Sequence, residues 1–135
     1  MKIRKIDHIG LACRDAAKAE AFYHGVLGLP VEEREDLDEM KLRVVKVRSS
    51  EVVLELLEPQ AGEETVTRFL AKNGEGIHHL CFEVENVAAA TAYLIGRGYA
   101  PVWDKPRPGA GGKLVNFLKP KETGGVLIEL SQSRA

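Results

Sequence analysis

The chain repeats itself at long range, and this repeat restricts the possible folds more than any other feature of the sequence. Residues 6–9 (IDHI) align with residues 77–80 (IHHL). Near the end of each half, residues 53–56 (VLEL) align with residues 127–130 (LIEL). Such self-similarity is typical of proteins that are built from duplicated supersecondary units. The 135 residues therefore divide into two modules that share one plan.

The residue pattern predicts the same order of elements, βαβββ, in both modules, and hence an α+β fold. Each module opens with a strand, at residues 8–14 and 79–85, and an N-capping residue follows, Asp15 or Asn86. An alanine-rich helix comes next and ends near Gly28 or Gly98, because glycine favours a helix C-terminus. Three further strands are expected in each module, around residues 31–35, 42–47 and 52–57, and around 101–104, 114–118 and 126–131.

A chain of this length makes one ordinary domain, so we expect a single domain over residues 1–135. Module one is expected at about residues 5–60 and module two at about residues 76–132. Between them, Val66, Phe69 and Leu70 lie at helical spacing, which predicts a linking helix at about residues 63–73.

Composition excludes several classes of protein. Hydrophobic residues make up 44% of the chain and charged residues 29%, which is typical of globular domains. The net charge of −1 excludes a broad basic surface for nucleic acid. No apolar run approaches the roughly 18 residues of a membrane span, and no apolar segment of a secretory signal follows the first lysines. Cys13 and Cys81 are too few for a disulfide scaffold, so we expect reduced thiols in a cytoplasmic protein.

Two histidines and two glutamates occupy equivalent places in the modules. Strand periodicity puts His8 and His79 on the polar or small face of the opening strands, with the apolar residues on the other face. Glu55 and Glu129 interrupt apolar strands, where an unpaired carboxylate would be costly to bury. We infer that these four side chains converge on a divalent ion such as Mn, Fe, Co, Ni or Zn. Six-coordinate geometry would leave two positions open for a bidentate substrate.

Each of these residues also has a simpler interpretation when it is taken alone. A single strand histidine is more often a hydrogen-bonded structural residue, and a single strand glutamate more often faces solvent. The repeat favours the metal site, because it relates all four residues to one another. His78 points to the opposite side of a regular strand and is left out of the ligand set.

Several motifs bear a family resemblance. Residues 7–10 (DHIG), 76–79 (GIHH) and 125–130 (GVLIEL) resemble the vicinal oxygen chelate superfamily, which includes glyoxalases, bleomycin resistance proteins and dioxygenases. Within it, residues 55–59 (ELLEP) and 116–121 (NFLKPK) are most similar to the methylmalonyl-CoA epimerase family. The resemblance extends from residue 6 to residue 132.

The resemblance implies a curved mixed sheet that surrounds a metal-binding cleft, with one divalent ion per chain. Cobalt is the usual ion of the family, and Mn²⁺, Ni²⁺ or Zn²⁺ would also suit the site. The ligands would map onto His8, Glu55, His79 and Glu129, and the family reaction interconverts (2R)- and (2S)-methylmalonyl-CoA, usually in a homodimer.

The resemblance also implies that Glu129 transfers the α-proton. Some family members carry an opposing carboxylate on the second strand of module one, but Val44 stands at the nearest aligned position here. Glu39, Lys46 or a water molecule remain as alternatives for this second group.

Basic residues surround the glycine-rich segment 107–112 and could bind the phosphates of coenzyme A. They could equally be ordinary solvated loop charges. The substrate-binding candidates are Arg107, Lys113, Asn116, Lys119 and Lys121.

Three other functions remain open at this point. A glyoxalase I-type lyase would use the same metal ligands on a glutathione hemithioacetal, and a metal-free module of this fold would only bind a small molecule. An extradiol dioxygenase fits less well, because it holds iron with three protein ligands.

Overall fold

The computed structural model describes residues 1–132, which form two compact units. The first unit consists of His8–His78, and the second unit consists of Met1–Asp7 together with residues 79–132. Strand β1 (Ile3–Ala12) contributes to both, because residues 3–7 belong to the second unit and residues 8–12 to the first. Within residues 1–132, no helix is long and apolar enough to cross a membrane.

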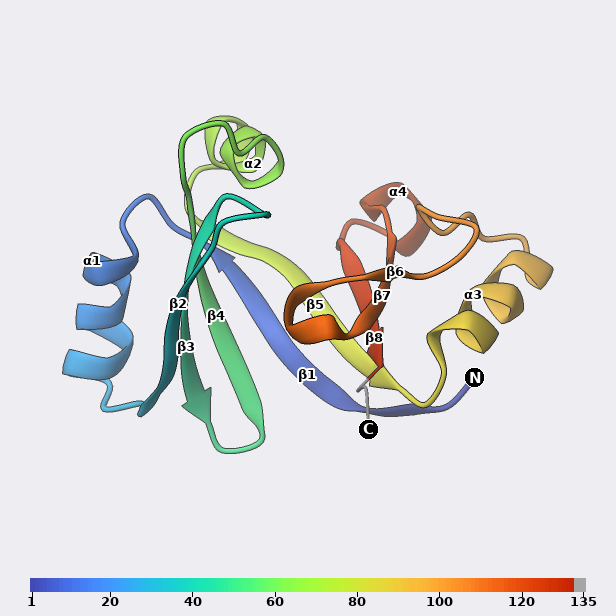
Figure 1. Cartoon of the computed structure of the whole chain (residues 1–135), viewed down its shortest axis with the longest axis horizontal. Helices are drawn as coiled ribbons and strands as arrows, with labels where there is room; N and C mark the ends of the chain where they lie inside the picture. Colours follow the sequence, from blue (N-terminus) through green and yellow to red (C-terminus); the bar gives the residue numbers. More distant parts are fainter. Residues whose placement is uncertain (133–135) are drawn as a thin grey trace. The chain divides into compact units, whose positions relative to one another are not determined.

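The first unit is built on strands in the order β2-β3-β4-β1 (Figure 1). Besides β1, these strands are β2 (Val31–Leu37), β3 (Leu42–Ser49) and β4 (Val52–Pro59). The strands β2, β3 and β4 are antiparallel neighbours, whereas β4 pairs with β1 in parallel. The sheet of this unit is therefore mixed.

The helix after β1 begins at its predicted cap and then widens. The Asp15 carboxylate accepts the Lys18 N–H at 3.2 Å, and α1 (Ala16–Glu20) follows. The chain continues as the π-helical segment η1 (Ala21–Val26), in which the Leu27 N–H donates to the carbonyl of Phe22, five residues earlier. The helix prediction is confirmed in position, but the π-helical turn was not foreseen.

Helices cover both faces of the first unit's sheet. On one face, Cys13, Val47 and Leu56 pack against α1. On the other face, Val44 and Leu57 pack beneath α2 (Thr65–Asn73), which lies where the linking helix is expected. Burial of each such aliphatic side chain contributes roughly 1.5–3 kcal/mol. The sequence predicts the α1 packing but not the α2 packing.

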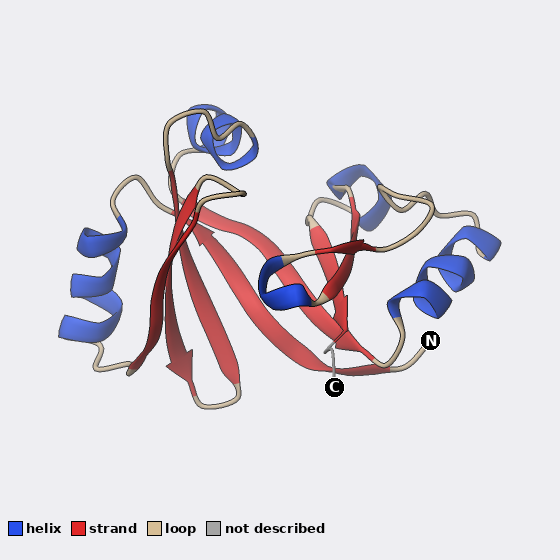
Figure 2. Cartoon of the chain, viewed as in Figure 1, coloured by secondary structure: helices blue, strands red, loops and turns tan. Residues whose placement is uncertain are grey.

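The second unit repeats the arrangement with the order β5-β8-β7-β6. Its strands are β5 (Gly76–Val84, of which residues 79–84 belong to this unit), β6 (Arg107–Pro108), β7 (Leu114–Leu118) and β8 (Ile128–Gln132). β5 pairs with β8 in parallel, and β7 is antiparallel to both β8 and β6. Figure 2 distinguishes these strands from the helices of the unit. The predicted α+β class, with a βαβββ module in each unit, is confirmed.

The core of the second unit lies between its sheet and α3 (Val87–Gly96). The Asn86 side chain caps this helix by accepting the Ala89 N–H at 2.9 Å, as predicted. Val84, Val87 and Leu130 form the buried cluster beneath the helix. The apolar face of β5 therefore packs on an alanine-rich helix, as expected.

Two parts of the second unit differ from the prediction. Residues 101–104 do not form a strand, and the short β6 follows them instead. A short helix, α4 (Pro120–Thr123), is present where none was predicted; Pro120 opens it, and Gly124 ends it in the left-handed conformation (φ 81°). A 3₁₀ turn, η2 (Ala110–Gly112), occupies the glycine-rich loop.

Candidate functional site

The first unit contains one half of the predicted ligand set. His8 on β1 and Glu55 on β4 lie close together, with 3.5 Å between Nδ1 of the imidazole and Oε2 of the carboxylate. Their side chains are 9% and 19% exposed. Glu55 lies on the face opposite to Leu54 and Leu56, which belong to the cluster against α1. The first unit therefore places an imidazole and a carboxylate together on the sheet face opposite α1.

The second unit contains the other half. Nε2 of His79 on β5 lies 3.1 Å from Oε1 of Glu129 on β8, and both side chains are at most 13% exposed. Ile128 and Leu130, the neighbours of Glu129, pack in the α3 cluster, so Glu129 lies on the opposite face.

The two pairs have the same strand register. Gly10, two residues after His8, is opposite Glu55 in the β1–β4 ladder. Cys81, two residues after His79, is opposite Glu129 in the β5–β8 ladder. Both ladders are parallel, and residues two apart share a face. The repeat seen in the sequence is therefore a repeat of strand register, with an imidazole and a carboxylate together in each unit, although His8 faces its carboxylate with Nδ1 and His79 with Nε2.

Lys46 shares the face of the first pair. It lies on β3 directly opposite Glu55, and its Nζ is 3.2 Å from Oε1 of Glu33. Burial lowers the pKa of the Lys46 ammonium, but the charge of Glu55 and the contacts with Glu33 and Glu35 outweigh it and hold this pKa above its usual value.

The other two positions named for a second proton-transfer group differ from Lys46. Val44 has an alkyl side chain with no titratable group, and it is 2% exposed and packs with Leu57 beneath α2. Glu39 lies in the exposed turn between β2 and β3.

His78 belongs to the first unit and lies against α2. Its ring meets the Phe69 ring edge to face, with centroids 5.1 Å apart. This orientation agrees with its exclusion from the ligand set.

The substrate-binding candidates fall in different surroundings within the second unit. Arg107 begins β6 and is exposed, while Nζ of Lys113 lies 3.6 Å from Oδ2 of Asp7. Lys119 is at the N-cap position of α4 and makes no side-chain capping hydrogen bond, Lys121 lies within the helix, and both are exposed.

Asn116 is the one buried member of that group, at 1% exposure. Its Nδ2 donates to the Thr91 hydroxyl and to the Trp103 carbonyl, both at 3.0 Å. Its Oδ1 accepts the N–H groups of Trp103 and Phe117. The amide therefore holds the segment around Trp103 against β7.

Trp103 was not singled out from the sequence. Its ring contacts both Phe117 and Arg107: the centroid of the Phe117 ring is 5.7 Å from the indole centroid, and Cζ of Arg107 is 4.7 Å from it. Two features of the sequence could have identified it as a functional residue: it is the single tryptophan of the chain, and it lies four positions before Arg107.

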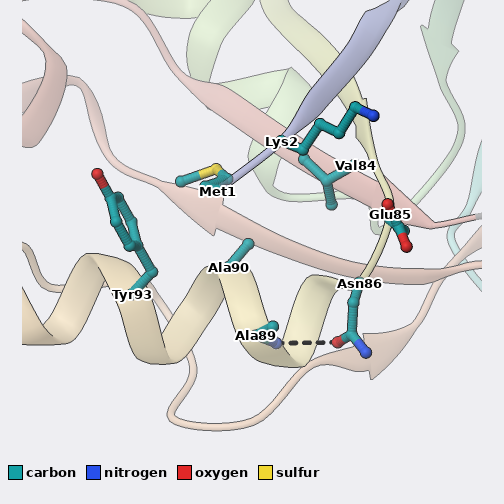
Figure 3. Close-up of a pocket in the computed structure, with 8 residues that line it drawn as sticks. All are labelled: Met1, Lys2, Val84, Glu85, Asn86, Ala89, Ala90 and Tyr93. Carbon is teal, nitrogen blue, oxygen red and sulfur yellow. Dashed lines mark hydrogen bonds between the residues drawn. The ribbon is translucent and has the colours of Figure 1, made fainter.

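A surface hollow of about 410 Å³ lies elsewhere in the second unit, between the first residues of the chain and α3 (Figure 3). Met1, Val84, Ala90 and Tyr93 supply much of its wall. None of the predicted ligand or substrate residues lines this hollow.

The chain belongs to the glyoxalase/bleomycin resistance protein/dioxygenase superfamily, whose family model matches residues 7–117. This match confirms the resemblance inferred from the motifs, and the two βαβββ units agree with it.

Relatives within this superfamily are named as epimerases. The chain is 41% identical to the mitochondrial methylmalonyl-CoA epimerase of Mus musculus, over 98% of the chain and 75% of the relative. It is 36% identical to an ethylmalonyl-CoA/methylmalonyl-CoA epimerase of Cereibacter sphaeroides, over 96% of the chain and 98% of the relative. Among solved structures, a methylmalonyl-CoA epimerase in complex with methylmalonyl-CoA and NH4+ matches with a TM-score of 0.89 and 37% identity, over 99% of this chain and 97% of the other.

Proposed function

We propose that the protein interconverts (2R)- and (2S)-methylmalonyl-CoA with the help of one divalent metal ion. The relatives identify the chain as an epimerase, which is an isomerase. The observation that carries the proposal further is the recurrence of one His–Glu pair, in one register, in both units.

The ligand set suits a divalent ion. His8 and His79 offer imidazole nitrogens, and Glu55 and Glu129 offer carboxylate oxygens, a mixture that borderline ions such as Co²⁺, Mn²⁺, Ni²⁺ and Zn²⁺ accept. In each unit the two donors are within 3.5 Å of each other and are mostly shielded from water, which favours a shared cation over two solvated groups. We propose that all four side chains hold the same ion in a cleft of the fold, with cobalt as the preferred metal.

The chemistry requires removal of a hydrogen from the carbon between the thioester and the carboxylate of the substrate. Negative charge then develops on the thioester oxygen, and a bound divalent ion would stabilise this charge as a Lewis acid. The protein has to orient the substrate, exclude water and supply a proton acceptor on one side of that carbon and a proton donor on the other.

Glu129 is the proposed proton acceptor on one side. Its contact with His79 at 3.1 Å holds the carboxylate on the face away from α3. One carboxylate oxygen can stay with His79 and the cation while the other meets the substrate, since a carboxylate has two acceptor oxygens.

Lys46 is the proposed partner on the other side. It lies directly opposite Glu55, whereas Val44 has no titratable group and Glu39 lies in an exposed turn. An ammonium group can return a proton to the α-carbon, which would complete the inversion of configuration.

Exchange of the α-hydrogen tests the proposal. The protein, loaded in turn with Co²⁺, Mn²⁺, Ni²⁺ and Zn²⁺, is incubated with methylmalonyl-CoA in deuterated water, and deuterium uptake is followed by mass spectrometry. We expect exchange and interconversion with at least one of these ions and none after chelation. The Glu129→Gln variant should lose exchange of the epimer whose α-hydrogen faces this carboxylate, and Glu85→Gln, which replaces an exposed glutamate of the same unit, should retain it.

Two outcomes would contradict the proposal. Turnover of methylglyoxal and glutathione without exchange on methylmalonyl-CoA would establish a glyoxalase I-type lyase. An absence of bound metal by elemental analysis, with tight binding of a small molecule and no exchange, would establish a binding module.

We further propose a homodimer that works in the cytoplasm, as the resemblance and the composition of the chain imply. Analytical ultracentrifugation tests the first statement, since a mass near twice 14.8 kDa is expected. Fractionation of the cells that produce the protein tests the second.

A further inference from the structure

Arg107 and Trp103 form a stacked pair at one edge of the second unit. Cζ of the guanidinium lies 4.7 Å from the centroid of the indole ring, within the range of a cation–π interaction. A guanidinium that stacks through its flat face keeps its N–H groups in the plane of the group. The cation–π contact does not use these N–H groups as hydrogen-bond donors, so they can bind an oxyanion.

Strand register places Arg107 on the same face as Glu129. Arg107 on β6 is directly opposite Val115 on β7, and Phe117, two residues further along β7, is directly opposite Glu129 on β8. Residues that are opposite each other, or two apart on one strand, have side chains on one face of a sheet. The guanidinium therefore shares a face with the carboxylate that we propose as the proton acceptor.

The position of Trp103 is fixed by hydrogen bonds to its backbone and by a contact of its ring. Asn116, itself 1% exposed, binds the N–H and the carbonyl of Trp103, and Thr91 of α3 accepts a further hydrogen bond from the same amide. The indole ring meets the Phe117 ring edge to face at 5.7 Å. The surface beneath Arg107 is therefore fixed by the core of the unit.

The charge of Arg107 is not compensated by a carboxylate within residues 1–132, where no acidic group lies within ion-pair distance of it. Lys113, the nearest basic residue along the chain after Arg107, is by contrast paired with Asp7. A positioned arginine without an acidic partner favours an anionic ligand.

We propose that Trp103 is a positioning residue that orients Arg107 as the receptor for an oxyanion of the acyl-CoA substrate. This inference rests on the proposed function, because it takes the substrate class from there. The oxyanion is either a phosphate of coenzyme A or the carboxylate of the acyl group, since both accept two hydrogen bonds from one guanidinium. Asn116 contributes indirectly, because it fixes Trp103.

Steady-state kinetics of the metal-loaded protein separate positioning from catalysis. Loss of a hydrogen-bonded charged pair weakens binding by about ten-fold or more, so Arg107→Gln should raise KM by about this factor and leave kcat nearly unchanged. Trp103→Leu should raise KM by about three-fold, as expected from loss of a cation–π contact, and Trp103→Phe should raise it less. The matched control is Arg97→Gln, because Cζ of Arg97 lies 5.1 Å from the centroid of the Tyr93 ring in the same unit, and Arg97 is not part of the proposed receptor.

A double-mutant cycle identifies the positioning role. If Trp103 acts through Arg107, then Trp103→Leu should have little further effect on KM in the Arg107→Gln background. Independent, multiplying effects on KM would overturn the inference. Thermal unfolding of each variant is measured as well. If the loss of substrate affinity in Trp103→Phe is accompanied by a clear fall in melting temperature, the residue acts through stability, and this would also overturn the inference.

Trp103 supplies a direct binding signal, because it is the single tryptophan of the chain. Its fluorescence is followed in wild type and Arg107→Gln during titration with propionyl-CoA, which lacks the carboxylate, and with methylmalonyl-pantetheine, which lacks the nucleotide phosphates. A ten-fold loss of affinity for propionyl-CoA alone assigns the phosphate, and the same loss for methylmalonyl-pantetheine alone assigns the carboxylate. Equal affinities of wild type and variant for both compounds would refute the receptor. If wild type itself turned over no methylmalonyl-CoA, the proposed function would fail instead.

Discussion

At the scale of single residues, Glu129 has to satisfy two demands that conflict. A carboxylate that binds a cation tightly is a weaker base, yet the proposed reaction requires it to accept a proton. One oxygen of this carboxylate lies 3.1 Å from Nε2 of His79, the side chain is 13% exposed, and the residue is directly opposite Phe117 in the β7–β8 ladder. Such a position excludes most water while leaving the carboxylate next to the face that we assign to the substrate.

Replacement of Glu129 by glutamine should therefore reduce the reaction far more than it reduces stability. Positioned acid–base groups contribute roughly 10²–10⁴ in rate, so we expect exchange of the epimer whose α-hydrogen faces Glu129 to fall by at least about 100-fold. The free energy of unfolding in urea should change by less than about 1 kcal/mol, since the amide keeps the shape of the side chain. A large loss of stability that parallels the loss of rate would instead assign Glu129 a structural role.

Lys46 can be tested separately from Glu129, because the two groups would act on opposite sides of the α-carbon. In Lys46→Met, one epimer of methylmalonyl-CoA should still exchange its α-hydrogen, but its conversion to the other epimer should fall by at least about 100-fold. Chiral analysis of the products in deuterated water measures both rates. Lys72→Met, an exposed lysine on α2, is the control. Wild-type interconversion in Lys46→Met would exclude the lysine and favour a water molecule.

At the scale of the elements, the parts that were predictable from sequence are those whose signals are local. Asp15 and Asn86 mark the beginnings of α1 and α3, and in the structure each accepts a backbone N–H of its own helix. Alternation of apolar and polar residues identified the face of β1 that carries His8, and the face of β5 that carries His79. The pairing of His8 with Glu55 is also anticipated, because the repeat relates it to His79 and Glu129.

The predictions that failed depend on contacts between distant residues. Residues 101–104 contain Val102 and Trp103, which favour a strand. In the structure the side chain of Asn116 binds both the N–H and the carbonyl of Trp103, so these groups are not available to a strand ladder. No local sequence pattern predicts a contact between a side chain and the backbone of a residue 13 positions away. The short helix α4 is different, because Pro120 at its start and Gly124 at its end are local sequence signals of a helix.

If the repeat extends to energetics, the N-caps of α1 and α3 should contribute equally to the free energy of unfolding. Asp15→Ala and Asn86→Ala each remove a side-chain acceptor from a helix N-terminus, which typically costs about 1 kcal/mol. Urea unfolding of each variant measures this change. Asn73→Ala, at the exposed C-terminal end of α2, should change the free energy by less than about 0.5 kcal/mol. If one of these two substitutions causes no loss of unfolding free energy, the repeat extends to the order of the elements but not to their energetics.

At the scale of the whole molecule, the proposal of one shared ion makes a prediction about stoichiometry. Two pairs that bind the same ion should give one metal per chain, whereas two independent pairs should give two. Both His8→Ala and His79→Ala should then abolish metal binding, measured by calorimetry, because each removes one donor of a common set. His24→Ala, whose ring contacts the Leu29 carbonyl at 2.7 Å, should keep the wild-type stoichiometry.

Metal binding should also raise the stability of the folded chain. A ligand that binds only the native state at 100 times its Kd stabilises it by about 2.7 kcal/mol. We expect a shift of this size for wild type in thermal or urea unfolding with Co²⁺, and none for His8→Ala or His79→Ala. If the shift persists in one of these two variants, the two His–Glu pairs do not bind the same ion.

The first strand of the chain belongs to two units, and this fact affects how the gene can be divided. Because residues 1–7 are part of the unit that otherwise consists of residues 79–132, a cut in the linking helix leaves that unit without its N-terminal segment. A fragment that begins after α2 should therefore be incomplete when it is expressed alone. Co-expression with the fragment that ends there should restore it, as chromatography of the reassembled halves would reveal. That result would show that the two halves, although alike in plan, are not autonomous.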